Sequence, residues 1–167
     1  MTLAEVNALD RPAFVAALGW VFEHSPWVAE AAWSSAPFAS LADLHAAMVA
    51  AVAAAPPSRQ TDLIRAHPDL GARATLTAAS TTEQSGAGLD RLTPDEFARL
   101  HQLNSAYREK FAFPFIYAVK GSTKHEILAA LALRLSATAE AEHALALTGI
   151  YRIAQFRLED LFHAPLR

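Results

Sequence analysis

The chain has 167 residues, of which 53% are hydrophobic and none is cysteine. This length suits about one domain, and the lack of cysteine excludes disulfides and thiolate metal sites. Lysine and arginine number 14 against 17 aspartates and glutamates, a net charge of −3 that argues against a nucleic-acid-binding surface. Alanine, the strongest helix former, supplies much of the hydrophobic fraction, so the composition predicts an all-α protein.

Helix start signals and breakers divide the chain into predicted helices. Capping-box spacing joins Thr2 to Glu5, Ser80 to Glu83, Thr93 to Glu96 and Thr123 to Glu126, and Pro26 and Pro94 suit the first helical position. The predicted helices cover residues 11–22, 26–34, 40–54, 57–66, 81–87, 94–110, 124–136 and 139–162. Because no repeat or linker interrupts them, we expect residues 1–167 to form a single-domain helical bundle, with irregular loops around its functional site.

Two stretches do not read as ordinary helix. Residues 66–90 are rich in glycine, serine and threonine, whereas residues 111–119 are aromatic and β-branched and are interrupted by Pro114. The second stretch predicts an extended segment against the core. Its phenylalanines could simply fill core volume. Its backbone, however, would lack helical partners, so its N–H and C=O groups are either tied to neighbours or available to a ligand.

A histidine stands where an apolar helical pattern has to stop. His67 precedes Pro68, and proline disfavours the α conformation for the residue before it. We therefore expect His67 at a helix end, where an imidazole with an unperturbed pKa of ~6.5 suits proton transfer near neutral pH. The alternative is a polar helix terminus without chemistry.

A carboxylate and an amide follow in the glycine-rich stretch. Glu83 and Gln84 lie just before a Gly-Ala-Gly-Leu sequence that ends at Leu89. Glu83 could be only the third helical residue of a capping box that begins at Ser80. If the loop instead brings both side chains towards His67, they would form an acid–base pair with an orienting amide.

Two further polar residues fall on apolar helical stripes. Arg157 shares a stripe of the last predicted helix with Ile150 and Leu161. A buried guanidinium needs an anionic or carbonyl partner, and its fork suits a carboxylate or a planar imide. The alternative is an edge residue that pairs with Asp160 or with a neighbouring helix. Asn104 is either a structural amide or a group that reads the ring of a ligand.

Several chemistries find no motif. The histidines show no His-Glu-x-x-His spacing, and there is no glycine-rich phosphate loop or nucleophile elbow, so we expect acid–base chemistry with no metal and no cofactor. The first residues lack the features of a signal peptide, and no run of about 20 apolar residues is present. We therefore expect a cytoplasmic protein without membrane contact.

The ordered combination of these motifs is similar to a known family. Ala66-His-Pro-Asp-Leu-Gly71, Glu83-Gln84, Asn104-x-x-Tyr107-x-x-Lys110-Phe-Ala-Phe-Pro-Phe115 and Arg157-Leu158 resemble the 2-oxo-4-hydroxy-4-carboxy-5-ureidoimidazoline (OHCU) decarboxylases of urate breakdown. The resemblance runs from about residue 14 to residue 161. It implies an all-helical homodimer, a carboxy-lyase without cofactor or metal that converts the small-molecule ureidoimidazoline to (S)-allantoin and CO2.

The resemblance also assigns roles to individual positions. It makes His67 the catalytic histidine and Glu83 the essential glutamate. It implies contact with substrate for Pro68, Gln84, Asn104, Phe111, Phe113, Phe115, Ile116 and Arg157. The chain departs from the family at Ala112, where glycine is frequent, and in a shorter stretch between Pro68 and Glu83. The competing interpretations are a non-catalytic helical ureide-binding module and a related cofactor-free lyase or hydrolase. The joint presence of His67 and Glu83 favours the decarboxylase.

Overall fold

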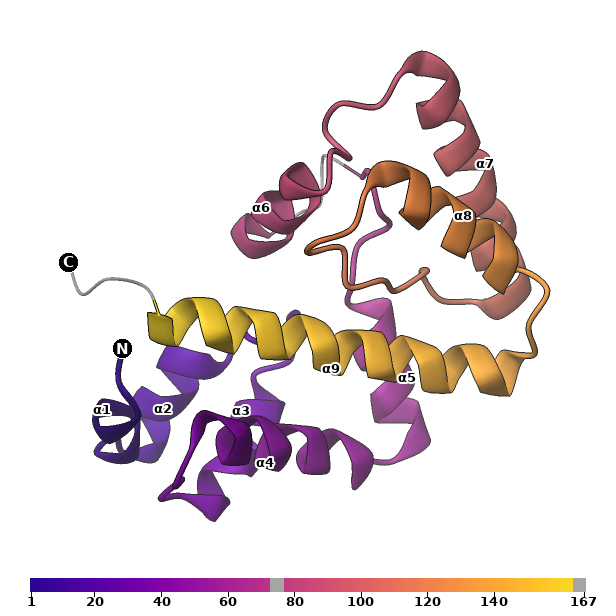
Figure 1. Ribbon diagram of the computed structural model, residues 1–167. Helices are drawn as coiled ribbons and strands as arrows, with labels where there is room; N and C mark the ends of the chain where they lie inside the picture. Colours follow the sequence, from indigo (N-terminus) through magenta and orange to yellow (C-terminus); the bar gives the residue numbers. More distant parts are fainter. Residues whose placement is uncertain (73–76, 164–167) are drawn as a thin grey trace. The chain divides into compact units, whose positions relative to one another are not determined.

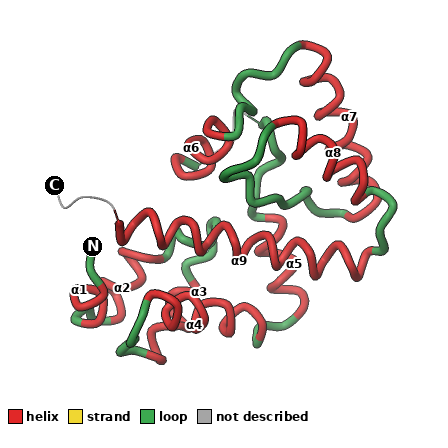
Figure 2. The backbone as a smooth tube through the Cα atoms, in the orientation of Figure 1, coloured by secondary structure: helices red, strands yellow, loops and turns green. Residues whose placement is uncertain are grey.

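The computed structural model describes residues 1–72 and 77–163, which consist of helices joined by loops, without strands (Figures 1 and 2). The prediction of an all-α fold is confirmed for this part of the chain. Two compact units can be distinguished, one formed by Met1–Ala66 with the chain from Tyr151 onwards, the other by His67–Ile150. The helices are α1 (Leu3–Asn7), α2 (Arg11–Leu18), α3 (Trp27–Ala32), η1 (Trp33–Ser35), α4 (Leu41–Ala53), α5 (Pro57–Arg65), α6 (Ala78–Gly86), α7 (Pro94–Phe111), α8 (Lys124–Arg134) and α9 (Ala139–His163).

The apolar core of the first unit is formed around α3. Helices α2 and α4 both pack against α3, and their apolar faces bury Phe14, Leu44 and Met48 almost completely. Burial of each such side chain contributes roughly 1.5–3 kcal/mol to stability.

In the described part of the chain, no single helix has the length and apolar composition to cross a membrane. Helices α4 and α5 meet that test only when they are joined across a 115° bend.

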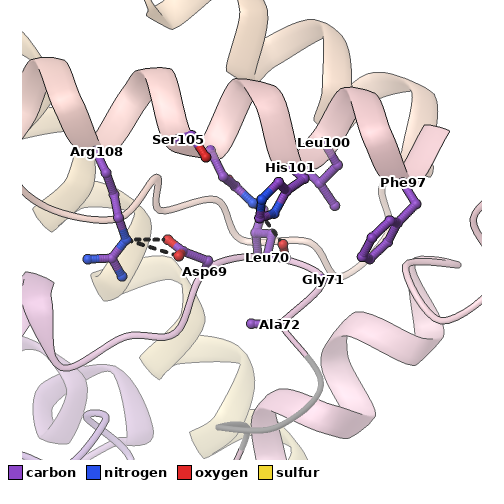
Figure 3. A pocket seen from close by; sticks show the side chains of 10 residues that line it. Asp69, Leu70, Gly71, Ala72, Phe97, Leu100, His101, Ser105 and Arg108 are labelled. Carbon is purple, nitrogen blue, oxygen red and sulfur yellow. Dashed lines mark hydrogen bonds and ion pairs between the residues drawn. The ribbon is translucent and has the colours of Figure 1, made fainter. Parts of the chain in front are cut away.

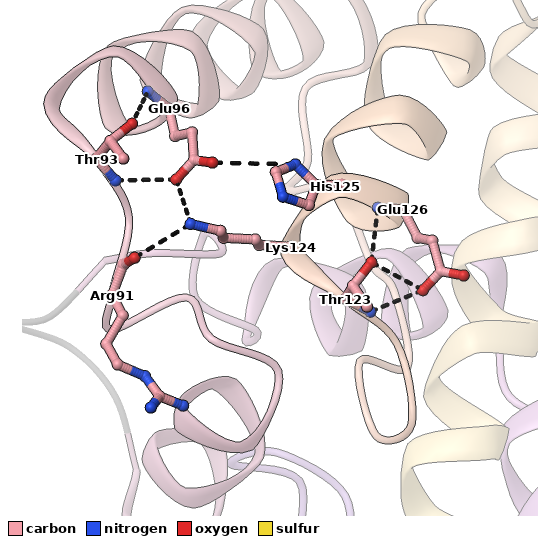
Figure 4. A network of polar contacts seen from close by, with 7 residues as sticks. All are labelled: Arg91, Thr93, Glu96, Thr123, Lys124, His125 and Glu126. Atoms are coloured by element: carbon pink, nitrogen blue, oxygen red, sulfur yellow. Dashed lines mark hydrogen bonds and ion pairs between the residues drawn. The ribbon is translucent and has the colours of Figure 1, made fainter.

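In the second unit, α7 packs on α8, and polar contacts join the starts of these two helices (Figure 4). Thr93 and Thr123 form the predicted capping boxes with Glu96 and Glu126. Glu96 also accepts a hydrogen bond of 2.6 Å from Lys124. This bond, with a second from the Thr93 N–H, lowers the pKa of Glu96. The first turn of α7 is therefore tied to the first turn of α8.

Most predicted helices are confirmed, with shifted ends. The helix predicted over residues 11–22 ends at Leu18, before Gly19, because glycine is the poorest helix former after proline. Pro26 is the N-cap of α3 rather than its first residue. A short helix, α1, begins at the predicted Thr2–Glu5 capping box.

The predicted capping box of Ser80 and Glu83 is wrong. Thr77 is the N-cap of α6, and its hydroxyl accepts the Ser80 N–H at 3.2 Å. The helix therefore starts at Ala78, which places Ser80 on a buried turn and Glu83 in the helix interior. Thr77 stands three residues ahead of Ser80, and Ser80 three residues ahead of Glu83, so the capping spacing alone fitted either hydroxyl. Residues 73–76 of the stretch predicted to be irregular lie outside the described residues.

The aromatic segment after α7 is non-helical, as predicted, and forms the loop between α7 and α8 in Figure 2. Ala112 ends α7 in the left-handed conformation, with φ 61° and ψ 21°. Residues 113–116 are then buried. The left-handed residue turns the chain off the helix axis, so that the following phenylalanines enter the core.

Ala112→Gly should stabilise the protein by about 1 kcal/mol, since the left-handed conformation costs an L-residue roughly 1–2 kcal/mol and costs glycine little. Urea unfolding should show this gain, and the melting temperature should rise by about 2–4 °C. The matched control is Ala129→Gly at an exposed position inside α8, which should lose about 1 kcal/mol. Equal losses from both substitutions would contradict the expected relief at Ala112.

Candidate active site

His67 lies where the sequence predicts it, immediately beyond the end of α5. The last helical residue is Arg65, and the N–H of the C-cap Ala66 donates to Asp62 at 2.9 Å. His67 is buried, with a relative exposure of 6%. Pro68 follows and prevents further helix. The chain thus holds an imidazole on non-helical backbone away from bulk water.

The loop after His67 is held by α6. The side-chain oxygen of Gln84, which is buried, accepts the Gly71 N–H at 2.8 Å. Gly71 has φ +80°, and a Cβ at this position would lie 2.7 Å from Leu100 Cδ2. The conformation requires glycine, and a Cβ would also force the end of the Leu100 side chain to shift. Gln84 therefore holds the loop after His67 by a bond to the Gly71 main chain, whereas its contact with a substrate stays a prediction.

Helix α7 holds the same loop from another side (Figure 3). The Asn104 amide donates to the Leu70 carbonyl at 2.9 Å. Arg108 Nε lies 2.9 Å from both carboxylate oxygens of Asp69. The backbone that carries His67 is consequently fixed by an amide, a second amide and an ion pair, and a displaced imidazole would have to break these contacts.

Glu83 belongs to the same unit as His67, on the helix that supplies Gln84. Its side chain is half-buried. The pairing of Glu83 with His67, and their acid–base roles, stay predictions.

Asn104 also lines a pocket of about 430 Å³ together with Leu70, Leu100 and Arg108 (Figure 3). The lining is largely apolar. Its amide nitrogen is used by Leu70, whereas its Oδ1 is buried and has no hydrogen-bond partner among the described residues. The two interpretations of Asn104 are thus both compatible with the structure: the amide supports a loop and retains one acceptor.

The predicted aromatic wall is built around one tyrosine. The rings of Phe111, Phe113 and Phe115 lie 4.5, 6.1 and 5.4 Å from the ring of Tyr107 between centroids. All three phenylalanines and Ile116 are buried. They therefore fill core volume in this unit, and their contact with a substrate stays a prediction.

Two buried polar residues of this unit, Tyr107 and Glu142, and the partly buried Arg134 had no role of their own in the sequence analysis. Tyr107 donates to Glu142 at 2.5 Å, and Arg134 Nε lies 3.1 and 2.9 Å from the two Glu142 oxygens. Burial, then the Glu142 carboxylate, raises the pKa of the Tyr107 phenol far above its usual range. A sequence signal could have revealed them: each is a polar residue that falls among the apolar positions of its own helix, and the three helices are different.

Arg157 is buried on α9, as its place on the apolar stripe predicts, with a relative exposure of 4%. Its partner is Glu23, 2.8 Å away and 1% exposed, and it also donates to the Val21 carbonyl at 3.3 Å. All three belong to the first unit. The requirement for an anionic partner is thus met inside the protein, by a glutamate that the sequence analysis did not single out.

The residues from 1 to 72 and from 77 to 163 contain no group of three or more His, Asp or Glu side chains placed to hold a metal ion. The second unit contains an imidazole, a carboxylate, two amides and a wall of aromatic rings. These features fit the class that the sequence predicts, a helical protein that performs acid–base chemistry on a small ligand.

Comparisons with known proteins define the family. The family model described as OHCU decarboxylase matches residues 7–159. The OHCU decarboxylases of Haloferax volcanii and Halalkalicoccus jeotgali are 45% and 44% identical to this chain, over 97% and 96% of it and 96% and 92% of their own lengths. A crystal structure of (S)-allantoin synthase superposes with a TM-score of 0.80 at 34% identity over 96% of this chain, which spans 54% of that protein. The chain belongs to the OHCU decarboxylase family.

Arg157→Leu should destabilise the protein by about 3–5 kcal/mol, because it leaves the Glu23 carboxylate buried without its cation. Urea unfolding measures the loss. The double variant Glu23→Leu/Arg157→Leu should lose less than Arg157→Leu alone, since it removes both charges. Arg152→Leu, an exposed arginine on the same helix, serves as control and should change stability by less than about 0.5 kcal/mol. Strictly additive losses would contradict the pairing.

Proposed function

We propose that this chain catalyses the cofactor-free decarboxylation of OHCU to (S)-allantoin and CO2, the third step from urate to allantoin. One observation carries the proposal beyond family membership. A buried His67 stands at a proline-blocked helix end, on a loop that Gln84 and Asn104 hold in place. A histidine kept for helix termination alone would need neither the burial nor these supports.

The proposed reaction needs no external electron sink. The carboxylate of the substrate is attached to a ring carbon next to a C=N bond. When the C–C bond to the carboxylate breaks, its electron pair forms a C=C bond and the imine electrons move onto nitrogen, which takes up a proton. The resulting enol then loses its hydroxyl proton to form a C=O bond, and the former imine carbon gains a proton. Uptake of that proton on one face gives a single enantiomer.

The proposed roles follow from these steps. His67 and Glu83 hold and move the protons, a contribution of typically ~10²–10⁴-fold. The backbone of residues 113–116 orients the ring. The substrate contact that the resemblance implies for Arg157 stays a prediction, because this guanidinium is already paired with Glu23. The phenylalanines exclude water, which favours the dispersed charge of the transition state over the carboxylate. Pro68, Gln84 and Asn104 complete the proposed substrate contacts.

A coupled assay tests this function. The unstable substrate is generated from urate with uricase and hydroxyisourate hydrolase, and circular dichroism follows allantoin. We expect the protein to produce one enantiomer rapidly. His67→Asn should cut the rate by ~10²–10⁴-fold while the far-ultraviolet spectrum stays unchanged, because only the proton-transfer group is lost. His125→Asn, at an exposed position in the same unit, should retain full activity.

Other outcomes would point elsewhere. Racemic allantoin at the spontaneous rate, with (S)-allantoin bound by the protein, would favour the ureide-binding module. Consumption of substrate without (S)-allantoin would favour a related lyase or hydrolase. A fully active His67→Asn variant would contradict the role of the imidazole.

The proposal extends to assembly and location. We propose a homodimer, on the family resemblance, and a cytoplasmic location, with which the cysteine-free composition agrees. Sedimentation equilibrium should give twice the chain mass of 18.0 kDa. A monomer mass at micromolar concentration would contradict the dimer.

A further inference from the structure

One polar cluster in the second unit has no place in the proposed chemistry, although two of its three members are fully buried. Helices α7, α8 and α9 each supply one residue: Tyr107, Arg134 and Glu142. Glu142 is fully buried and Tyr107 is too, while the Arg134 side chain keeps 17% of its exposure. A buried carboxylate is costly unless it is neutralised and hydrogen-bonded. Arg134 supplies the charge and Tyr107 the additional donor.

Arg134 has a second contact that a simple ion pair would not need. Its Nη1 donates to the Ile116 carbonyl at 2.9 Å. The guanidinium carbon also lies 4.6 Å from the centroid of the Phe115 ring, and that ring meets the Tyr107 ring edge-on. Arg134 thus holds two consecutive residues of the aromatic segment 113–119, Ile116 by its carbonyl and Phe115 by its ring.

The geometry of the guanidinium explains why the three contacts coexist. Nε is hydrogen-bonded to the Glu142 carboxylate, and Nη2 lies 2.8 Å from Glu142 Oε2 as an ion-pair contact not aligned as a hydrogen bond. Nη1 points along a different edge of the plane, to Ile116. A planar fork can do this, whereas a lysine ammonium is a single point of charge.

Helix α9 confines Ile116 from a further side. A Cβ added at Gly149 would lie 3.1 Å from Ile116 Cγ2 and 3.5 Å from its carbonyl oxygen. The segment therefore lies against helix backbone at Gly149 and is drawn to Arg134 by its carbonyl. Since residues 113–119 have no helical or strand hydrogen bonds of their own, these contacts determine the position of the segment.

We propose that Arg134 is a positioning residue: Glu142, itself bound by Tyr107, holds the guanidinium, and the guanidinium fixes residues 115 and 116 at the place from which they orient the substrate ring. This inference rests on the proposed decarboxylase function, in which the segment contacts the substrate. Arg134 touches no reacting atom. Its loss leaves His67 and Glu83 in place but lets the segment shift.

Arg134→Met tests the role by activity. We expect kcat per folded molecule to fall by about 10- to 100-fold, since a misplacement of ~1 Å costs on the order of 10²-fold. The product should also lose enantiomeric purity, whereas the pH profile should stay that of the wild type. Arg134→Lys, which restores the charge without the fork, should recover only part of kcat. The control is Lys124→Met, which removes the ion pair to Glu96 in the same unit and should leave kcat unchanged.

Hydrogen–deuterium exchange tests the same role without turnover. In Arg134→Met, amides of peptides covering residues 113–119 should exchange faster than in the wild type, and in Lys124→Met they should not. Unchanged exchange in this segment would overturn the proposal, as would a wild-type kcat and enantiomeric purity in Arg134→Met. If the wild-type protein made no (S)-allantoin while Arg134→Met still loosened the segment, the proposed function would fail and the positioning of the segment would stand.

Discussion

Irregular backbone inside a helical protein must find hydrogen-bond partners outside the helices, and this constraint determines the second unit. Two non-helical segments, residues 67–71 and 113–119, enter buried surroundings there. The first is held by Gln84 and Asn104, and the second by Arg134. Each partner is a side chain that binds a main-chain group. An unmade bond of this kind costs roughly 1–3 kcal/mol, so the partners cannot be exchanged for apolar residues of similar size.

The same constraint explains where the protein keeps its buried charges. Glu142 is neutralised by Arg134, and Glu23 by Arg157. Replacement of such pairs by apolar side chains is often neutral for stability. Their retention is therefore better explained by position than by stability. In the second unit the guanidinium also reaches the Ile116 carbonyl, which an apolar pair could not do.

The sequence predicted what depends on local patterns. Helix classes, three of the four capping boxes and the break at Pro68 are decided by residues within one turn of each other, and the structure confirms them. The start of α6 was missed because two hydroxyl residues stood at capping distance from different partners. The apolar stripe revealed that Arg157 is buried, but not that Glu23, 134 residues earlier, would neutralise it.

The candidate site shows the same limit. The position of His67 follows from its neighbour, proline, and was predictable. The support of its loop by Gln84 and Asn104 depends on contacts 13 and 34 residues apart. Neither distance has a signature in the sequence, because an amide on an apolar stripe looks alike whether it holds backbone or ligand. Tyr107, Arg134 and Glu142 lie on three helices, and only folding makes them one cluster.

The use of buried polar side chains to hold the backbone suits the proposed reaction. The substrate carries its own electron sink, so the protein has little bond-breaking to assist. What remains is geometry: the carboxylate must lie across the ring plane, and the proton must arrive on one face. Rigid placement of the substrate and of the proton donor can meet both demands. Buried amides and a guanidinium hold the backbone of this protein in place. Such rigidity suits a reaction whose main demand is stereochemical, the delivery of a proton to one face of the ring.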